Sequence, residues 1–286
     1  MRYLFILFST LFSCQSTNQT DKPFEFGEPL GAIEPRLAEA SGLAASIANA
    51  GLLWTLNDSG NPAEVFLIDT TAQIKMICHL MNVENRDWED IVVGSGPDST
   101  KNYIYVADIG DNRAIYPVKI LYRFEEPIFT GPTQEISDFE TLFVKLDDGI
   151  RDAEAIMVDP WQKDMYLLSK REDSIHLYHV AFPFEDDTLT VRYQFTLPFH
   201  NITAAEISLD GTEIVIKDYD HIYYWKRLDK VPIGKLLQTQ PILLNYKPEQ
   251  QGESITFSRN GSGFFTLSET KANEHNPANL LFYRRR

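Results

Sequence analysis

Cysteine is almost absent from this chain, whose 286 residues contain two, Cys14 and Cys78. If Cys14 carries a lipid, as argued below, Cys78 stands alone and no disulfide framework can form. The fold must then be stabilised by its hydrophobic core. Hydrophobic residues make up 43% of the chain and aromatic residues 12%, which suits one large all-β domain over residues 23–286.

Several catalytic and binding motifs are also missing. The sequence has no glycine-rich phosphate loop, no CxxC or HExxH metal motif and no Gly-x-Ser-x-Gly turn. Its net charge of −15 argues against nucleic-acid binding and against docking of the protein surface on anionic lipid. We therefore expect neither a nucleic-acid partner nor a serine hydrolase.

The N-terminus has the parts of a secretory signal. Met1-Arg2 is positively charged, and the apolar run over residues 3–12 is too short to span a bilayer as a mature helix. Leu11-Phe12-Ser13-Cys14 resembles the bacterial lipobox, which is cleaved before a diacylated cysteine; an ordinary signal peptide is the alternative. We expect a lipoprotein signal over 1–14, lipidation of Cys14, a polar tether over 15–22 and a lipid anchor in the bacterial cell envelope, at the outer membrane.

A short polar, usually acidic, group precedes an alternating apolar run five times along the chain. The five copies recur at intervals of 48 to 65 residues and start at Ser41, Glu89, Glu154, Ala205 and Glu253. Each copy is followed by further short runs that are rich in β-branched and aromatic residues and bounded by turn residues, which is typical of strands. This spacing matches one four-stranded sheet repeated as the blade of a propeller.

We therefore predict an all-β β-propeller of five four-stranded blades. The fifth blade lacks a fourth strand of its own, and the segment over residues 24–37 is expected to supply it, closing the ring with both ends of the chain. Six blades are the alternative if the 65-residue interval between Glu89 and Glu154 contains a degenerate blade.

The repeat also predicts which side chains share a face of the propeller. In an up-and-down blade, the start of the first strand and the end of the second lie at the same end. Ser41, Glu89, Glu154 and Glu253 should therefore surround the mouth of the central channel. A second circle should contain Asn57, Asp58, Asp108, Asp111, Lys170, Arg171, Lys217, Asp218 and Glu269.

Three carboxylates that converge at a narrow axis repel one another unless a cation neutralises them or their pKa values rise. Oxygen ligands without cysteine or histidine favour a hard cation, and calcium tolerates an irregular shell of six to eight ligands. We expect Ser41, Glu89, Glu154 and Glu253 to bind calcium. The alternative is that these glutamates accept hydrogen bonds from backbone amides of the neighbouring blade.

Parts of the repeat resemble known families. Trp88-Glu89-Asp90-Ile91, Ala153-Glu154-Ala155 and Gly252-Glu253-Ser254-Ile255 resemble the five-bladed calcium-dependent apyrases. That resemblance implies one calcium ion in the central tunnel, held by serine and glutamate side chains of the inner strands. The fourth copy departs from the pattern, with Ala205 where serine is expected and Thr203 and Glu206 nearby. Glu39-Ala40-Ser41-Gly42 and Asn57-Asp58-Ser59-Gly60 also resemble uncharacterised secreted β-propeller lipoproteins of bacteria, which implies a fold and an envelope location.

Two functions are compatible with these observations. The first is a calcium-stabilised, monomeric lipoprotein whose polar face binds a small molecule or an envelope protein through the second circle of residues. The second is a calcium-dependent, apyrase-like phosphohydrolase in which Lys170, Arg171 and Lys217 bind phosphates. Paired carboxylates could also act on a glycoside, although nothing in the sequence separates an acid from a nucleophile.

Overall fold

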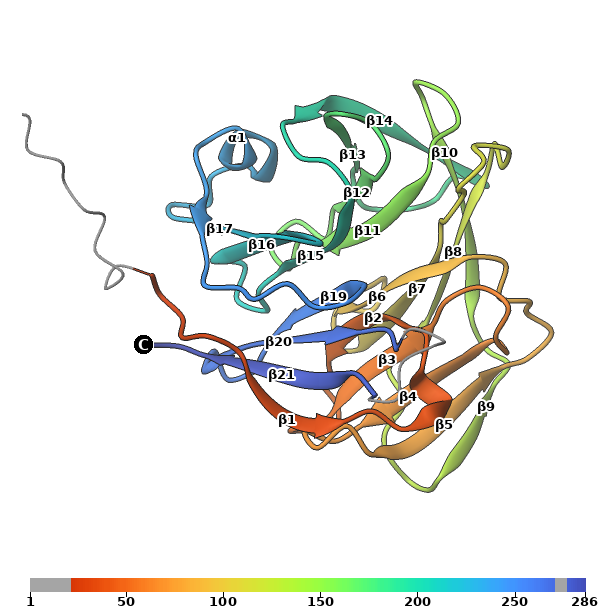
Figure 1. Ribbon diagram of the computed structural model, residues 1–286. Coiled ribbons are helices and arrows are strands. Elements are labelled where there is room, and N and C mark those ends of the chain that lie inside the picture. Colours follow the sequence, from red (N-terminus) through yellow and green to blue (C-terminus); the bar gives the residue numbers. More distant parts are fainter. Residues whose placement is uncertain (1–21, 271–276) are drawn as a thin grey trace, which may run out of the picture.

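The computed structural model describes residues 22–270 and 277–286 (Figure 1). Cys14 and residues 1–14, together with all of the predicted tether except Lys22, lie outside this range. The described residues form β-strands with one short α-helix, α1 (Ile233–Leu237), and one 3-10 turn, Pro35–Leu37. None of the described helices has the length and hydropathy needed to cross a membrane.

The strands fall into groups of four that follow one another along the chain. The first group is β2 (Ala40–Ala45), β3 (Leu53–Asn57), β4 (Glu64–Ile68) and β5 (Ile74–Leu80), and the second is β6 (Trp88–Ser95), β7 (Asn102–Asp108), β8 (Lys119–Glu125) and β10 (Glu140–Leu146). The third is β11 (Ala153–Val158), β12 (Met165–Ser169), β13 (Ile175–Val180) and β14 (Thr188–Leu197). The fourth is β15 (Ile202–Ile207), β16 (Glu213–Asp218), β17 (Ile222–Lys226) and β18 (Ile242–Leu243). The fifth is β19 (Gly252–Phe257), β20 (Gly263–Ser268), β21 (Asn279–Arg284) and β1 (Glu28–Ala32).

The last sheet is closed by the N-terminal strand. β1 pairs antiparallel with β21, so that the strand order is β1-β21-β20-β19 (Figure 1). Pairing of Glu28 with Phe282 and of Ala32 with Asn279 defines the register. The prediction that residues 24–37 supply the missing outer strand is therefore confirmed.

The first strands of the five groups surround a common axis. Each of β2, β6, β11, β15 and β19 contacts the next in that order, and β19 contacts β2. This closed ring of inner strands is the arrangement of a β-propeller, and each group of four strands is called a blade below. The long interval between Glu89 and Glu154 contains the additional strand β9 (Thr133–Ile136), which pairs parallel with β5 of the first blade. The outer strands β10 and β14 also pair in parallel, which joins the second and third blades into one eight-stranded sheet.

The hydrophobic core is divided among the junctions between neighbouring blades. Five clusters of buried residues occur, and each contains side chains from two adjacent blades. Alternate residues of a strand point to opposite faces. On β16, Val215 therefore packs toward the fifth blade while Ile214 and Ile216 pack toward the third. Burial of both faces explains why these strands are apolar at successive positions.

Two carboxylates, those of Asp90 and Glu206, also connect neighbouring inner strands. Asp90 accepts hydrogen bonds from the backbone amides of Ile91 (2.8 Å) and of Ile156 on β11 (2.9 Å). Glu206 of β15 accepts hydrogen bonds from the hydroxyl of Thr256 (2.8 Å) and from the backbone amide of Phe257 on β19. These two acids thus have the blade-joining role that was the alternative for the channel glutamates.

Candidate functional site

A β-bulge occurs at the corresponding place in all five inner strands. The register with the second strand shifts between Ala40 and Gly42, Trp88 and Asp90, Ala153 and Ala155, Ile202 and Ala204, and Gly252 and Ser254. The bulged residues are therefore Ser41, Glu89, Glu154, Thr203 and Glu253. A bulge re-aims its side chain relative to the regular pleat and is common beside functional sites. The structure thus assigns one such residue to each inner strand at one end of the ring.

The bulges also revise the alignment of the fourth repeat. Thr203, and not Ala205, is the structural counterpart of Ser41 and the three glutamates. The hydroxyls of Ser41 and Thr203 have similar partners in the next blade, because Ser41 Oγ donates to the carbonyl of Glu89 (2.9 Å) and Thr203 Oγ1 to that of Gly252 (3.0 Å). These two hydroxyls join blades, and the glutamates carry the charge.

The three bulged glutamates belong to a larger group of acids. The charge of each acid in this group affects, or is affected by, the charge of at least one other acid at this end of the ring. We call this group the acidic centre; it contains Asp58, Asp87, Glu89, Glu154, Glu253 and Glu269. Glu89, Glu154, Glu253 and Glu269 are all at least 91% buried, so solvent screens their mutual repulsion poorly.

Lys170 places a cation inside the acidic centre. Its Nζ lies 2.5 Å from Glu154 Oε1 and 3.8 Å from Glu253 Oε1, and its side chain is 7% exposed. Tyr219 closes over this pair: its ring lies 5.6 Å from Lys170 Nζ and its hydroxyl donates to Glu253 Oε1 (2.6 Å). Glu154 and Glu253 therefore already have a positively charged partner from the chain itself.

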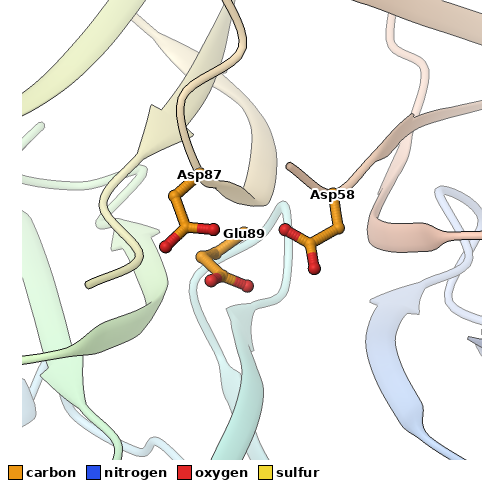
Figure 2. Close-up of side chains that lie close together, drawn as sticks. All are labelled: Asp58, Asp87 and Glu89. Atoms are coloured by element: carbon orange, nitrogen blue, oxygen red, sulfur yellow. The ribbon is translucent and has the colours of Figure 1, made fainter. Parts of the chain in front are cut away.

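Asp58, Asp87 and Glu89 form the part of the acidic centre that could hold a metal ion. Figure 2 shows the side chains of Asp87 and Glu89, which come from one segment, close to that of Asp58 from another. One oxygen from each lies within 4.8 Å of the other two. The two oxygens of any pair can therefore contact the same cation when its bonds to oxygen are about 2.3–2.6 Å long, as those of calcium are. An all-carboxylate donor set also suits a hard cation.

Gly110 allows the backbone to approach these carboxylates. A Cβ atom built on Gly110 would overlap with Glu89 Oε1 and lie 2.5 Å from Asp87 Cγ. Its amide also donates to the carbonyl of Asp87 (3.1 Å). A side chain at position 110 would therefore fill the space between two of the three proposed ligands.

Substitution of this glycine gives a direct test of the geometry. We expect Gly110→Ala to weaken calcium binding and to destabilise the fold by about 1–3 kcal/mol, because Asp87 and Glu89 must move away from the new methyl group. Gly131→Ala is the control, since a Cβ there meets no atom within 4 Å. Calcium titrations and urea denaturation of both variants measure the effects, and equal behaviour of the two would contradict this role of Gly110.

Burial and mutual repulsion raise the pKa values of several carboxyl groups in the acidic centre. Burial raises the pKa of Asp58 to about 6, that of Glu154 to about 8 and that of Glu269 to about 9. Burial, together with the charges of Glu154 and Asp58, raises the pKa of Glu89 well above its ordinary value. Burial alone would lower the pKa of Lys170, but Glu154, Glu89 and Glu253 outweigh it and raise that pKa.

These shifts predict how stability depends on pH. The folded state binds more protons than the unfolded state between the ordinary carboxyl pKa near 4.5 and the folded values of about 8 and 9. In chelator, the free energy of unfolding should therefore fall between pH 5.5 and pH 8.5, by about 3–4 kcal/mol for each of these two groups, and calcium should reduce this slope. Urea denaturation between pH 5.5 and pH 8.5 measures the free energy of unfolding. A free energy of unfolding that rises with pH would contradict the raised pKa values.

The remaining residues of the predicted second circle have structural partners. Asn57 donates to the carbonyl of Arg36 (2.7 Å), and Asp108 pairs with Arg86 (3.1 Å). Asp111 pairs with Lys119 (3.0 Å), and Arg171 Nε donates to Asp152 (2.6 Å). Lys217 is fully buried and donates to the carbonyls of Asp218 (3.2 Å) and Gly252. Of the second circle, the structure brings Asp58, Lys170 and Glu269 into the acidic centre.

Sequence reasoning did not assign Asp87 or Tyr219 to the site. Asp87 lies two residues before Glu89, and alternate residues of an extended segment share a side. That spacing could have identified Asp87. Tyr219 follows the end of β16, and its contact with Lys170 depends on packing between the third and fourth blades, for which the sequence carries no signal.

Solved structures share this fold. The PQQ-bound form of an aldose sugar dehydrogenase from Streptomyces coelicolor has a TM-score of 0.54 and 8% sequence identity, over 90% of this chain and 96% of that chain. A Dos1 propeller (TM-score 0.41, 13% identity, 86% and 68% covered) and a nidogen/laminin complex (TM-score 0.47, 11% identity, 85% and 83% covered) also match. Neither a protein-family model nor a curated protein sequence matches. The chain is thus a β-propeller, and at such low identity its function must be argued from its own residues.

Proposed function

We propose that this β-propeller binds one calcium ion at Asp58, Asp87 and Glu89, and that the ion completes a surface on the polar face for a small molecule or a protein partner. One observation carries the proposal. The buried Glu89 carboxyl group lies beside Asp58 and Asp87, and its side-chain hydrogen bond is with Glu154, which is itself an acid. Acids that are buried together repel one another in their charged forms, and a divalent cation would remove that cost.

The proposed ligand set differs from the one that the sequence suggested. Glu154 and Glu253 contact Lys170, and the Ser41 hydroxyl donates to a backbone carbonyl. Glu89 is common to both sets, while Asp58 and Asp87 replace the other three residues. The ion and Lys170 would then divide the acidic centre, each neutralising a different part of it.

A calcium-dependent phosphohydrolase has less support than a binding function. Lys170 contacts Glu154, and Lys217 is buried against the carbonyl of Gly252, so two of the three cations expected to bind phosphates have other partners. Arg171 is the exposed member of the three, with 48% of its side chain accessible, but it pairs with Asp152. Phosphate would have to displace these contacts.

The location of the protein is part of the proposal and rests on the N-terminal sequence. A lipid on Cys14 would hold the propeller in the bacterial cell envelope, with the segment 15–22 as a spacer. The mass of the mature protein tests this, because a diacylated N-terminal cysteine differs from an unmodified cleaved chain.

Equilibrium dialysis with calcium tests the binding function. We expect one ion per chain in the wild type, loss of that ion in Asp87→Asn, and wild-type binding in the control Glu135→Gln, whose side chain is exposed on β9. Phosphate release from nucleoside triphosphates in calcium distinguishes the two functions. Release that disappears in Asp87→Asn would favour the hydrolase, and absence of both calcium binding and release would contradict both proposals.

A further inference from the structure

A cavity lies between the fifth and first blades, at the end of the propeller opposite to the acidic centre. The strands β2 and β19 have their bulges near their first residues, and the cavity lies where both strands end, at Ala45 and at Ser258, which follows β19. It has a volume of about 530 Å³, and its walls come from the turns between β2 and β3, between β4 and β5 and between β19 and β20. None of the proposed calcium ligands lines it, so the two sites are separate.

Arg259 places a positive charge at this cavity. The residue is exposed, and its side chain extends from the fifth blade toward the first, where Nη1 donates to the carbonyl of Ser46 (3.3 Å). Seven other arginines pair with a carboxylate, whereas Arg259 has no ion pair within residues 22–270 and 277–286. In a chain with 41 acidic and 26 basic residues, the protein thus leaves most donors of this guanidinium group for an anion.

The turn that carries Arg259 is held by its own hydrogen bonds. The amide of Gly261 donates to the carbonyl of Ser258 (2.9 Å), and the amide of Ser262 donates to Asn260 Oδ1 (3.0 Å). Gly261 has a φ of 69°, a conformation that glycine adopts without strain. Because the fold already fixes the backbone of the turn, a ligand would have to order only the Arg259 side chain, which lowers the cost of binding.

The charge of the cavity favours an anion. Among the residues that the structure describes, its lining contains no aspartate or glutamate. Two carboxylates adjoin the lining, and both have donors of their own. Asp69 accepts hydrogen bonds from two amides of its own turn (2.8 and 3.1 Å), and Glu126 accepts them from the Ser46 hydroxyl (2.6 Å) and Trp54 Nε1 (3.0 Å). A cationic ligand would therefore meet Arg259 and no carboxylate of the lining.

The rest of the cavity can hold an apolar group. Leu53 and Phe265 line it and are 2% and 7% exposed, and the Phe265 ring packs on that of Phe282 with centroids 4.7 Å apart. Leu52 is half-buried and Ala50 is exposed, so these two residues supply the accessible apolar wall. The guanidinium group and this wall belong to the same cavity, which suits a ligand with one charged end and one apolar end.

We propose that this cavity binds a small monocarboxylate with a compact apolar body. The carboxylate accepts a pair of parallel hydrogen bonds from the planar guanidinium group of Arg259, and the apolar body packs against Leu52 and Ala50. This site goes beyond the calcium site and does not rest on it. Either site can be absent without affecting the other.

Phenylacetate is a suitable probe. Phenylacetamide has the same shape without the charge, and acetate has the charge without the apolar body. In calorimetric titrations of the folded wild type, we expect phenylacetate to bind at least about tenfold more tightly than either of them. Arg259→Gln should weaken phenylacetate binding by about tenfold or more. The matched control Arg192→Gln removes an exposed arginine from β14 and should leave the binding of phenylacetate unchanged.

The melting temperature and calcium dialysis of Arg259→Gln show that the variant is folded, and both should match the wild type. Absence of phenylacetate binding to the wild type at millimolar concentration, equal affinity for phenylacetamide or acetate, or full binding by Arg259→Gln would each overturn the carboxylate site. Phenylacetate binding should persist in Asp87→Asn. Its loss in that variant, if the variant is folded, would contradict the separation of the two sites.

Discussion

Replacement of Lys170 by methionine is expected to lower the free energy of unfolding by about 3–5 kcal/mol, the cost typical of removing one partner from a buried ion pair. Lys170 and Glu154 have side chains that are 7% and 2% exposed, and their charged atoms are 2.5 Å apart. Without the ammonium group, Glu89, Glu154 and Glu253 would share a poorly solvated space, and none of the other residues that the structure describes places a cation between them. Urea denaturation at pH 8 in chelator measures the loss.

Two controls separate this effect from a general loss of charge. Lys101→Met breaks an exposed ion pair with Glu125 (2.6 Å, side chains 44% and 59% exposed), which should change stability little. Lowering the pH to 5.5 should recover much of the stability of Lys170→Met, because Glu89, Glu154 and Glu269, whose pKa values are raised, then carry protons. A loss no larger than that of Lys101→Met would show that Lys170 does not neutralise the centre.

Calcium is expected to raise the melting temperature of the wild type by about 5–10 °C relative to chelator. A ligand at a hundred times its dissociation constant stabilises the folded state by about 2.7 kcal/mol. For a domain of this size, each kcal/mol corresponds to about 2–4 °C. Calorimetry or circular dichroism at pH 7.5, in millimolar calcium and in chelator, measures the shift.

Glu89→Gln should separate the effect of bound calcium on the melting temperature from the effect of the charge of the carboxylate. In chelator this variant should melt at or above the wild-type temperature, because a neutral amide removes like-charge repulsion with Glu154 and Asp58. In calcium it should show no increase, because one of the three ligands is gone. Glu135→Gln should respond as the wild type does. A full calcium shift in Glu89→Gln would place the ion elsewhere.

The strand pattern was predictable because both faces of most strands are buried. Leu53–Leu56 and Phe264–Leu267, for example, are two of the short apolar runs that follow the repeated polar groups, and they lie within β3 and β20. Closure by the N-terminal segment followed from the missing strand of the last repeat. β9 was missed, because Thr133–Ile136 is a short strand that adds in parallel to the edge of a distant sheet. Such long-range pairing leaves little local signal.

The sequence predicted the site residues in those copies of the repeat that were correctly aligned with one another. Five residues occupy bulges, and three of them bear charge. The copies that begin at Glu89, Glu154 and Glu253 identified these three. The fourth copy was misaligned by two residues, because its apolar run continues through Ala204 and Ala205 and hides the bulge at Thr203. The position of Lys170 between Glu154 and Glu253 could not be predicted, since it depends on the direction of one side chain across the channel.

Anomalous scattering from crystals grown in calcium would test the central claim most directly. The account predicts one calcium peak among the carboxylates of Asp58, Asp87 and Glu89, with Lys170 still in contact with Glu154. A map with no peak at those three residues in saturating calcium, or a peak that replaces Lys170 between Glu154 and Glu253, would contradict it.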